Sequence, residues 1–73
     1  MGKARVLSGR GACRILERNG FRAIRRRGSH IVMQKKDART TFTVVVPDHA
    51  ELRKGTLASI IRQSGLPKEI FET

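Results

Sequence analysis

Alternating apolar residues in two neighbouring segments restrict the possible fold of this chain more than any other feature. In residues 30–36 and 41–46 apolar side chains recur at alternating positions, namely Ile31 and Met33 in the first segment and Phe42, Val44 and Val46 in the second. In a β-strand this period of two places the apolar side chains on one face and leaves the other face to solvent. The sequence therefore predicts a sheet that is covered on one face and open on the other.

Turn-forming residues divide the same region into three strands. Gly20 precedes the first strand, and Gly28 and Ser29 form a tight turn between the first and the second. Pro47 ends the third strand, which is rich in β-branched residues. The expected strands are residues 21–27, 30–36 and 41–46. Short connections between consecutive strands predict an antiparallel three-stranded sheet.

Helical segments are predicted on both sides of the strands. Ser8 is a suitable N-cap residue for a helix that ends before Gly20. Leu57 and Ile60 recur at helical spacing in a second helix, which Gly65 ends. The expected helices are residues 8–19 and 55–64, followed by a short C-terminal helical turn at residues 67–72.

The order of these elements predicts the fold class. It is α+β, a two-layer α-β-β-β-α fold in which the three-stranded antiparallel sheet packs against two helices. The 73 residues fit one domain that spans residues 1–73. This is the topology of double-stranded-RNA-binding domains, although topology alone does not establish RNA binding.

Length and charge together favour a polymeric anion as the partner. A chain of this size buries only about 60% of the surface that its unfolded form exposes, so a deep substrate cleft is not expected. The sequence has 16 Lys and Arg residues against 6 Asp and Glu residues, a net charge of +10. Residues 1–36 hold eleven of these cations and a single acid, Glu17. An open surface with this charge makes nucleic acid the expected partner.

Membrane, metal and cofactor sites are not expected. No apolar run approaches the roughly 20 residues of a membrane-spanning helix. Residues 1–11 lack the apolar segment of a secretory signal, so a cytoplasmic protein is expected. The His, Cys and acidic residues show none of the spacings of metal ligands, so neither a metal nor another cofactor is expected. The single cysteine, Cys13, is expected to act as a small buried apolar residue.

One histidine lies in the most basic part of the chain. His30 follows the Gly28-Ser29 turn and is flanked by Arg25, Arg26, Arg27, Lys35 and Lys36. An imidazole can give or take a proton near neutral pH, and neighbouring cationic groups can hold a phosphate and stabilise its developing charge. These are the groups that cleavage of RNA through its own 2′-hydroxyl requires. From the residues alone, the alternative is a surface histidine that makes a local hydrogen bond.

The second histidine follows the third strand. His49 lies in the segment VPDH and could supply a second proton-transfer group, pack against the sheet or contact a phosphate. Asp48 precedes it and is interpreted as a residue whose side chain orders backbone amides in the connecting segment.

Five segments, taken together, resemble the HicA family of bacterial and archaeal mRNA interferase toxins, also called YcfA-like. They are ILERNGF at 15–21, RRRGSHIVM at 25–33, VPDH at 46–49, KGTLASIIRQSGL at 54–66 and EIF at 69–71. Their order and spacing within so short a chain make the resemblance specific. It extends from about Ser8 to Glu72.

The resemblance implies a double-stranded-RNA-binding-like fold and a ribonuclease that cleaves messenger RNA. In the family the histidine of the Gly-Ser-His turn is catalytic, and it corresponds to His30. The histidine of the VPxH segment corresponds to His49, a possible secondary site residue. We therefore expect a type II toxin that is a metal-independent endoribonuclease with His30 as general acid or base. The residues expected to bind RNA are Arg25, Arg26, Arg27, Gly28, Ser29, Lys35, Lys36 and Lys54.

The resemblance also implies a partner protein, an antitoxin of the HicB type. The expected partners are thus messenger RNA and this antitoxin, with the toxin monomeric alone and hetero-oligomeric in the complex. Two other functions are compatible with the residues. One is a non-catalytic RNA-binding module of the same fold, in which His30 only contacts the RNA backbone. The other is an interaction protein whose basic face docks an acidic partner and which has no role on RNA.

Overall fold

The computed structural model describes residues 7–72, so residues 1–6 and 73 of the expected domain lie outside the described residues. The elements are α1 (Gly9–Arg18), β1 (Arg22–Arg27), β2 (His30–Lys36), β3 (Thr41–Pro47), α2 (Lys54–Ser64) and the 3-10 helix η1 (Lys68–Phe71). The three strands form one antiparallel sheet in the order β1-β2-β3. The predicted α+β class and the α-β-β-β-α order are confirmed.

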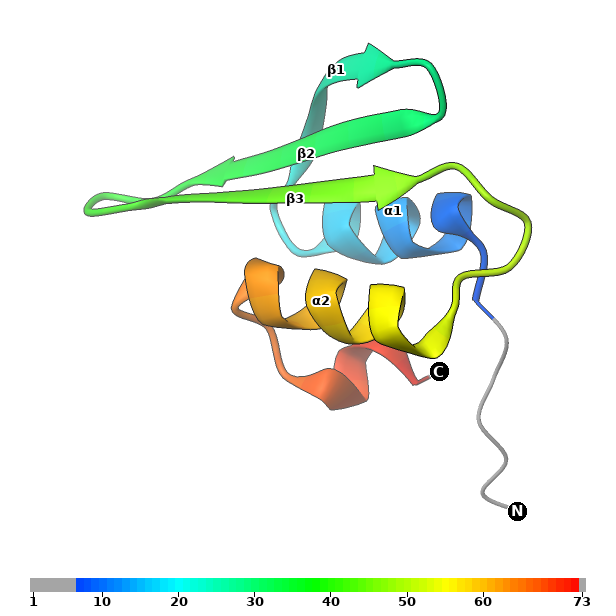
Figure 1. Ribbon diagram of the computed structural model, residues 1–73. Coiled ribbons are helices and arrows are strands. Elements are labelled where there is room, and N and C mark those ends of the chain that lie inside the picture. The colour runs from blue at the N-terminus through cyan, green and yellow to red at the C-terminus, as the bar shows by residue number, and fades with distance from the viewer. Residues whose placement is uncertain (1–6, 73) are drawn as a thin grey trace.

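Both helices lie on the same side of the sheet (Figure 1). Ile31 and Met33 of β2 are buried, and their cross-strand partners Val46 and Val44 of β3 are buried as well. Val45, between the two buried valines, is 44% exposed on the other face. The predicted alternation is confirmed: one face of the sheet holds the core, and the other, the open face, is covered by none of the helices in residues 7–72 (Figure 1).

The core lies between this inner face of the sheet and the helical layer. Its residues outside the sheet come from every helical element and from both flanking loops: Ala12, Ile15, Leu16, Phe21, Leu52, Ile60 and Phe71. Leu16, Met33 and Ile60 are among the largest fully buried side chains. Cys13, expected to be buried, is only half-buried and packs against the edge of this cluster.

The first turn of α1 lies against the end of β3. The predicted N-cap is confirmed, because Gly11 N–H donates to Ser8 Oγ at 2.9 Å. Gly9 N–H donates to the carbonyl oxygen of His49 at 2.8 Å. A Cβ atom at Gly9 would overlap the Pro47 carbonyl oxygen and lie 3.0 Å from Asp48 Cα. Only glycine therefore allows this close approach of helix and strand.

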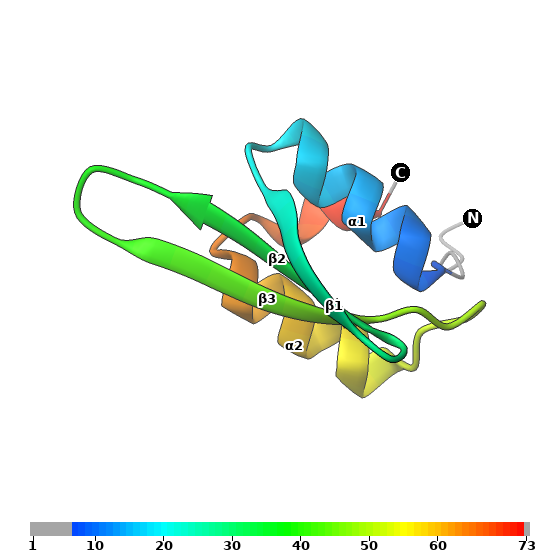
Figure 2. The same ribbon diagram turned by 90° about the horizontal axis from the view of Figure 1, so that it is seen from above.

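A two-residue turn joins β1 to β2. Gly28 has a φ of 58°, whereas the φ of Ser29 is negative. This combination is that of a type II′ turn, which suits the twist of a β-hairpin. The turn lies at the end of the sheet where β3 ends and where both helices begin (Figure 1). At the other end, the β2–β3 hairpin extends past both helices (Figure 2).

The two edge strands are interrupted in different ways. β1 has a register shift between Ala23 and Arg25, so Ile24 is an extra residue, a β-bulge. On β3, Val45 N–H donates to Gln63 Oε1 of α2 at 3.4 Å, and Pro47 has no N–H group. All six residues of β1 are exposed.

Candidate functional site

His30 lies on the open face at one end of the central strand. It is the first residue of β2, and it pairs with Arg27 of β1 on one side and with Pro47 of β3 on the other. Its neighbour Ile31 is buried on the helix side, so the His30 side chain is directed to the open face, where it is exposed. This position leaves the imidazole accessible to a large substrate.

The register of β1 divides the three consecutive arginines between the two faces of the sheet. Arg25 pairs with Val32 and Arg27 with His30, so both lie on the open face with the histidine. Arg26 pairs with the buried Ile31 and lies on the helix side. Two of the three predicted arginines are thus neighbours of His30 on one surface, and the third is directed away from it.

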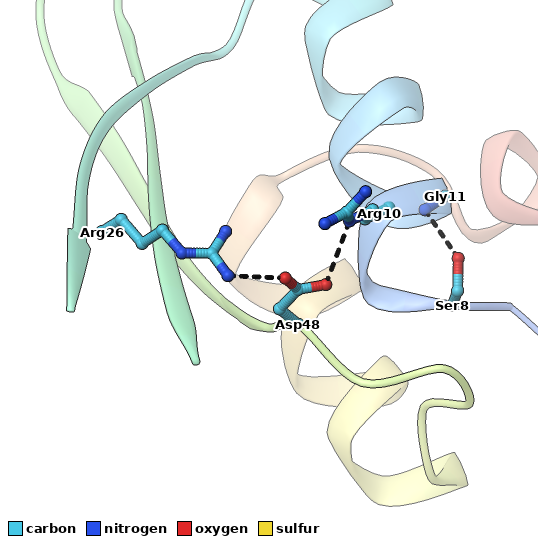
Figure 3. Close-up of polar contacts among 5 residues, drawn as sticks. All are labelled: Ser8, Arg10, Gly11, Arg26 and Asp48. Atoms are coloured by element: carbon cyan, nitrogen blue, oxygen red, sulfur yellow. Dashed lines mark hydrogen bonds and ion pairs between the residues drawn. The ribbon is translucent and has the colours of Figure 1, made fainter. Parts of the chain in front are cut away.

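Arg26 instead binds an aspartate that follows β3. Arg26 Nη2 donates to Asp48 Oδ2 at 2.7 Å, and Arg10 Nε of α1 lies 3.4 Å from Asp48 Oδ1 (Figure 3). The Asp48 side chain is only 14% exposed, whereas that of Arg10 is 74% exposed. The hydrogen bond from Arg26 is the main cause that lowers the pKa of Asp48, partial burial opposes it, and the charge of Arg10 lowers the pKa further. The carboxylate is therefore ionised at neutral pH.

The backbone of Asp48 contacts the turn before His30. Asp48 N–H donates to the Ser29 carbonyl oxygen at 2.6 Å. His49 N–H donates to the Pro47 carbonyl oxygen at 2.9 Å, which makes a γ-turn centred on Asp48. The interpretation that the Asp48 side chain orders backbone amides is wrong, because within residues 7–72 its carboxylate contacts the guanidinium groups of Arg10 and Arg26 instead. Nothing in the local sequence pairs these three residues, which lie far apart along the chain.

The lysines predicted to bind RNA are distributed along the molecule. Lys35 and Lys36 are at the other end of β2, and six steps of about 3.3 Å separate Lys36 from His30 by roughly 20 Å. Lys35 Nζ lies 5.9 Å from the centroid of the Phe21 ring, on the helix side. Lys54 is the exposed first residue of α2, at the same end of the molecule as the β1–β2 turn (Figure 1). The structure therefore does not bring Lys35 and Lys36 to the histidine.

His49 lies near the same end of the sheet as His30. It is exposed, and its carbonyl oxygen accepts the hydrogen bond from Gly9. Pro47 pairs directly with His30, at a Cα separation of about 5 Å, and His49 is two residues further on. The two histidine Cα atoms are thus within about 13 Å, since each residue adds at most about 3.8 Å.

Three other features of the described residues concern metal binding, membrane insertion and the reactivity of the cysteine. Within residues 7–72, no group of three or more His, Cys, Asp or Glu side chains is placed to hold a metal ion. None of the helices described is long and apolar enough to cross a membrane. Burial, followed by the charge of Glu17, raises the pKa of the Cys13 thiol, which makes it a poor nucleophile.

Fold and site together define a class of protein: a small basic α+β domain with an exposed histidine among arginines on an open sheet face. A family model described as the HicA toxin of bacterial toxin-antitoxin systems matches residues 9–66. The chain belongs to the HicA toxin family, which confirms the resemblance, and it is the toxin of a toxin-antitoxin system. A search of curated proteins found no match. A toxin of this kind has an antitoxin as its partner, and the matched residues include both histidines and Asp48.

Proposed function

We propose that this toxin is a metal-independent endoribonuclease that cleaves messenger RNA, with His30 as general acid or base. The observation that carries the proposal is the common placement of His30, Arg25 and Arg27 on the open face of the sheet. An exposed imidazole with two arginines of the adjacent strand on the same face offers proton transfer and phosphate binding in one region of the surface.

The chemistry uses the RNA's own nucleophile. The 2′-hydroxyl oxygen attacks the adjacent phosphorus and loses its proton, while the bond to the 5′-oxygen breaks and that oxygen gains a proton. His30 takes the first proton or supplies the second, and Arg25 and Arg27 stabilise the extra negative charge on the phosphate. The other proton is handled by water or by His49. The products then carry a 2′,3′-cyclic phosphate and a 5′-hydroxyl end.

RNA is held mainly through its phosphates. Lys36 lies on the open face about 20 Å from His30, which is far enough for it to bind a different nucleotide of the same strand. Gly28, Ser29 and Lys54 lie at the His30 end and complete the proposed RNA surface. Phosphate contacts position a strand without specifying its sequence, so we expect loose sequence selectivity and affinity that falls steeply with salt.

The antitoxin, proposed to be of the HicB type, inhibits by covering the open face and His30. A net charge of +10 favours fast association with an acidic partner surface. The toxin alone is then monomeric, and the inactive complex is hetero-oligomeric.

Cleavage of a defined messenger RNA by the purified toxin, with EDTA present throughout, tests the proposal. We expect His30→Ala to lower kcat by about 10²–10⁴-fold, the usual contribution of a general acid or base, with RNA binding retained. His49→Ala, which removes the same side chain from the neighbouring loop, identifies the group that handles the other proton: a comparable fall in kcat assigns that role to His49, and an unchanged kcat assigns it to water. If wild type and His30→Ala both bind RNA and neither cuts it, the protein is an RNA-binding module instead. Products with 3′-hydroxyl ends would exclude attack by the 2′-hydroxyl.

A further inference from the structure

The three arginines before the turn are consecutive in sequence but differ in structure because of the bulge in β1. Ala23 pairs with Met33, and the next pair is Arg25 with Val32, so β1 advances two residues while β2 advances one. Ile24 is the extra residue, and it is 51% exposed. A bulge of this kind redirects the side chains that follow it, because each residue after it faces the opposite side from where an uninterrupted register would place it.

The bulge determines which arginines share a face with His30, as a comparison with an uninterrupted pairing of β1 and β2 shows. Without the extra residue, Arg25 would pair with the buried Ile31, and Arg26 would pair with His30 on the open face. The observed register places Arg25 and Arg27 there instead, so His30 has two arginine neighbours on its face. Arg26 is at the same time directed to the helix side, where it meets Asp48.

Asp48 contacts both ends of residues 26–29, the segment that precedes His30. Its carboxylate accepts from Arg26 at 2.7 Å, and its N–H donates to the Ser29 oxygen at 2.6 Å. The same carboxylate pairs with Arg10 of α1 at 3.4 Å, which fixes it to the helical layer (Figure 3). In addition to the pairing of β1 with β2, this contact attaches the end of β1 to the segment that follows β3. His30 directly follows the segment held in this way.

We propose that the arginine triplet is divided between two roles. Arg25 and Arg27 bind RNA phosphates beside His30, whereas Arg26 is a positioning residue that acts with Asp48 to hold the turn before His30. The Arg26 side chain is 53% exposed, but its Nη2 donates a short charge-assisted hydrogen bond to a largely buried carboxylate. This bond offsets the charge of Arg26 and keeps its guanidinium on the helix side, away from a phosphate beside His30. This inference rests on the proposed ribonuclease function and assigns its substrate-binding and positioning residues.

Three matched variants test the division: Arg25→Gln, Arg26→Gln and Arg27→Gln. Each removes one positive charge, from +10 to +9, by the same substitution at adjacent positions. Two experiments are made with each variant at a temperature where circular dichroism shows that the variant is folded. The first measures kcat and KM for cleavage. The second is the salt dependence of binding to the same RNA with a 2′-deoxy nucleotide at the cleavage site, which prevents cutting.

We expect opposite patterns at neighbouring positions. Arg25→Gln and Arg27→Gln weaken binding and each reduce the slope of log K against log salt by about 0.7, the value for one phosphate contact on a single strand. Arg26→Gln leaves affinity and slope unchanged but lowers kcat by on the order of 10- to 100-fold, because a displacement of about 1 Å at the reacting groups has an effect of this size. Arg26→Lys, which retains a cation near Asp48, recovers part of kcat.

Asp48→Asn provides a second, independent variant. It keeps the backbone bond to Ser29 and the side-chain size, and it removes the charge that holds Arg10 and Arg26. We expect kcat to fall as in Arg26→Gln while RNA binding tightens, with a steeper salt slope by about 0.7 for each arginine released. The double variant of Arg26→Gln and Asp48→Asn should lose no more kcat than the single ones, since both break the same contact.

The outcomes separate this inference from the proposed function. If the wild type cuts RNA and Arg26→Gln weakens binding and flattens the salt slope as much as its two neighbours, the division of the triplet is wrong. If Arg26→Gln and Asp48→Asn lower only the melting temperature and leave kcat intact, Arg26 is a structural residue and the positioning role is wrong. If the wild type binds RNA without cutting it, the ribonuclease proposal and the positioning role fail together. The binding comparison then still decides which arginines contact RNA.

Discussion

Replacing Gly9 with alanine should destabilise the protein, although alanine is the better helix former. Gly9 is the first residue of α1, and an added Cβ would overlap the Pro47 carbonyl oxygen and lie 3.0 Å from Asp48 Cα. These obstacles are backbone atoms, which cannot rotate away as a side chain can. Gly55, in the first turn of α2, is a matched control, because a Cβ there would meet no atom within 4 Å.

The expected size of the effect follows from three contributions. Overpacking of a close contact costs about 1–3 kcal/mol. A shift that breaks the 2.8 Å bond from Gly9 N–H to the His49 oxygen costs a further 0.5–1.5 kcal/mol, approximately. The replacement of glycine by alanine in a helix returns about 0.5–1 kcal/mol at either position. With the middle value of each range, we expect Gly9→Ala to lower the free energy of unfolding by about 2 kcal/mol and Gly55→Ala to raise it slightly.

Thermal unfolding followed by circular dichroism measures both variants. For a domain of this size 1 kcal/mol corresponds to about 4–8 °C, so Gly9→Ala should lower Tm by roughly 8–16 °C. Gly55→Ala should leave Tm unchanged or raise it by a few degrees. A Gly9→Ala variant as stable as the wild type would refute the reasoning, because it would mean that helix and strand separate at no cost.

Two further predictions concern the ion pairs and the core. The pKa of Asp48 is held below its ordinary value of 3.8 mainly by the hydrogen bond from Arg26, so the stability that this contact adds is complete above about pH 4 and is lost as pH falls through the lowered pKa. The difference in urea midpoint between wild type and Asp48→Asn should accordingly be larger at pH 6 than at pH 2, and an equal difference at both would contradict the assignment. Met33 is fully buried, so Met33→Ala should cost about 2–5 kcal/mol of the roughly 4–11 kcal/mol available to a chain of this length, whereas Val45→Ala on the open face should cost under about 1 kcal/mol. Equal urea midpoints for these two variants would show that the buried face is not the one assigned here.

The order of the elements could be predicted because its signals act over a few residues. Gly28 stands where the turn needs a positive φ, and Ser8 accepts the first hydrogen bond of the helix that it was expected to cap. The alternation of Ile31 and Met33 identifies the buried face directly, since the period of a strand is a local property. These features depend on neighbours in the chain, which the sequence displays.

The division of the arginines could not be predicted, because it depends on contacts between distant residues. A run of three identical residues has no alternation that marks a face, and the bulge at Ile24 is not signalled by glycine or proline. Arg26 meets Asp48, 22 residues further along the chain, and only the folded structure brings them together. Conversely, Lys36 is close to His30 in sequence but distant in space, because an extended strand separates them.

The interruptions of the two edge strands limit how another chain can bind this one. A strand added beside β1 would meet the bulge at Ile24, and one added beside β3 would have to replace Gln63 at Val45 N–H and would find no donor at Pro47. Growth of the sheet by backbone pairing is thus disfavoured at both edges, which also protects newly made copies from aggregating with one another. We therefore expect an antitoxin to recognise side chains of this toxin rather than to extend its sheet. Because a few substitutions can alter contacts between side chains, such recognition allows each of several related toxins to bind its own antitoxin in preference to the others.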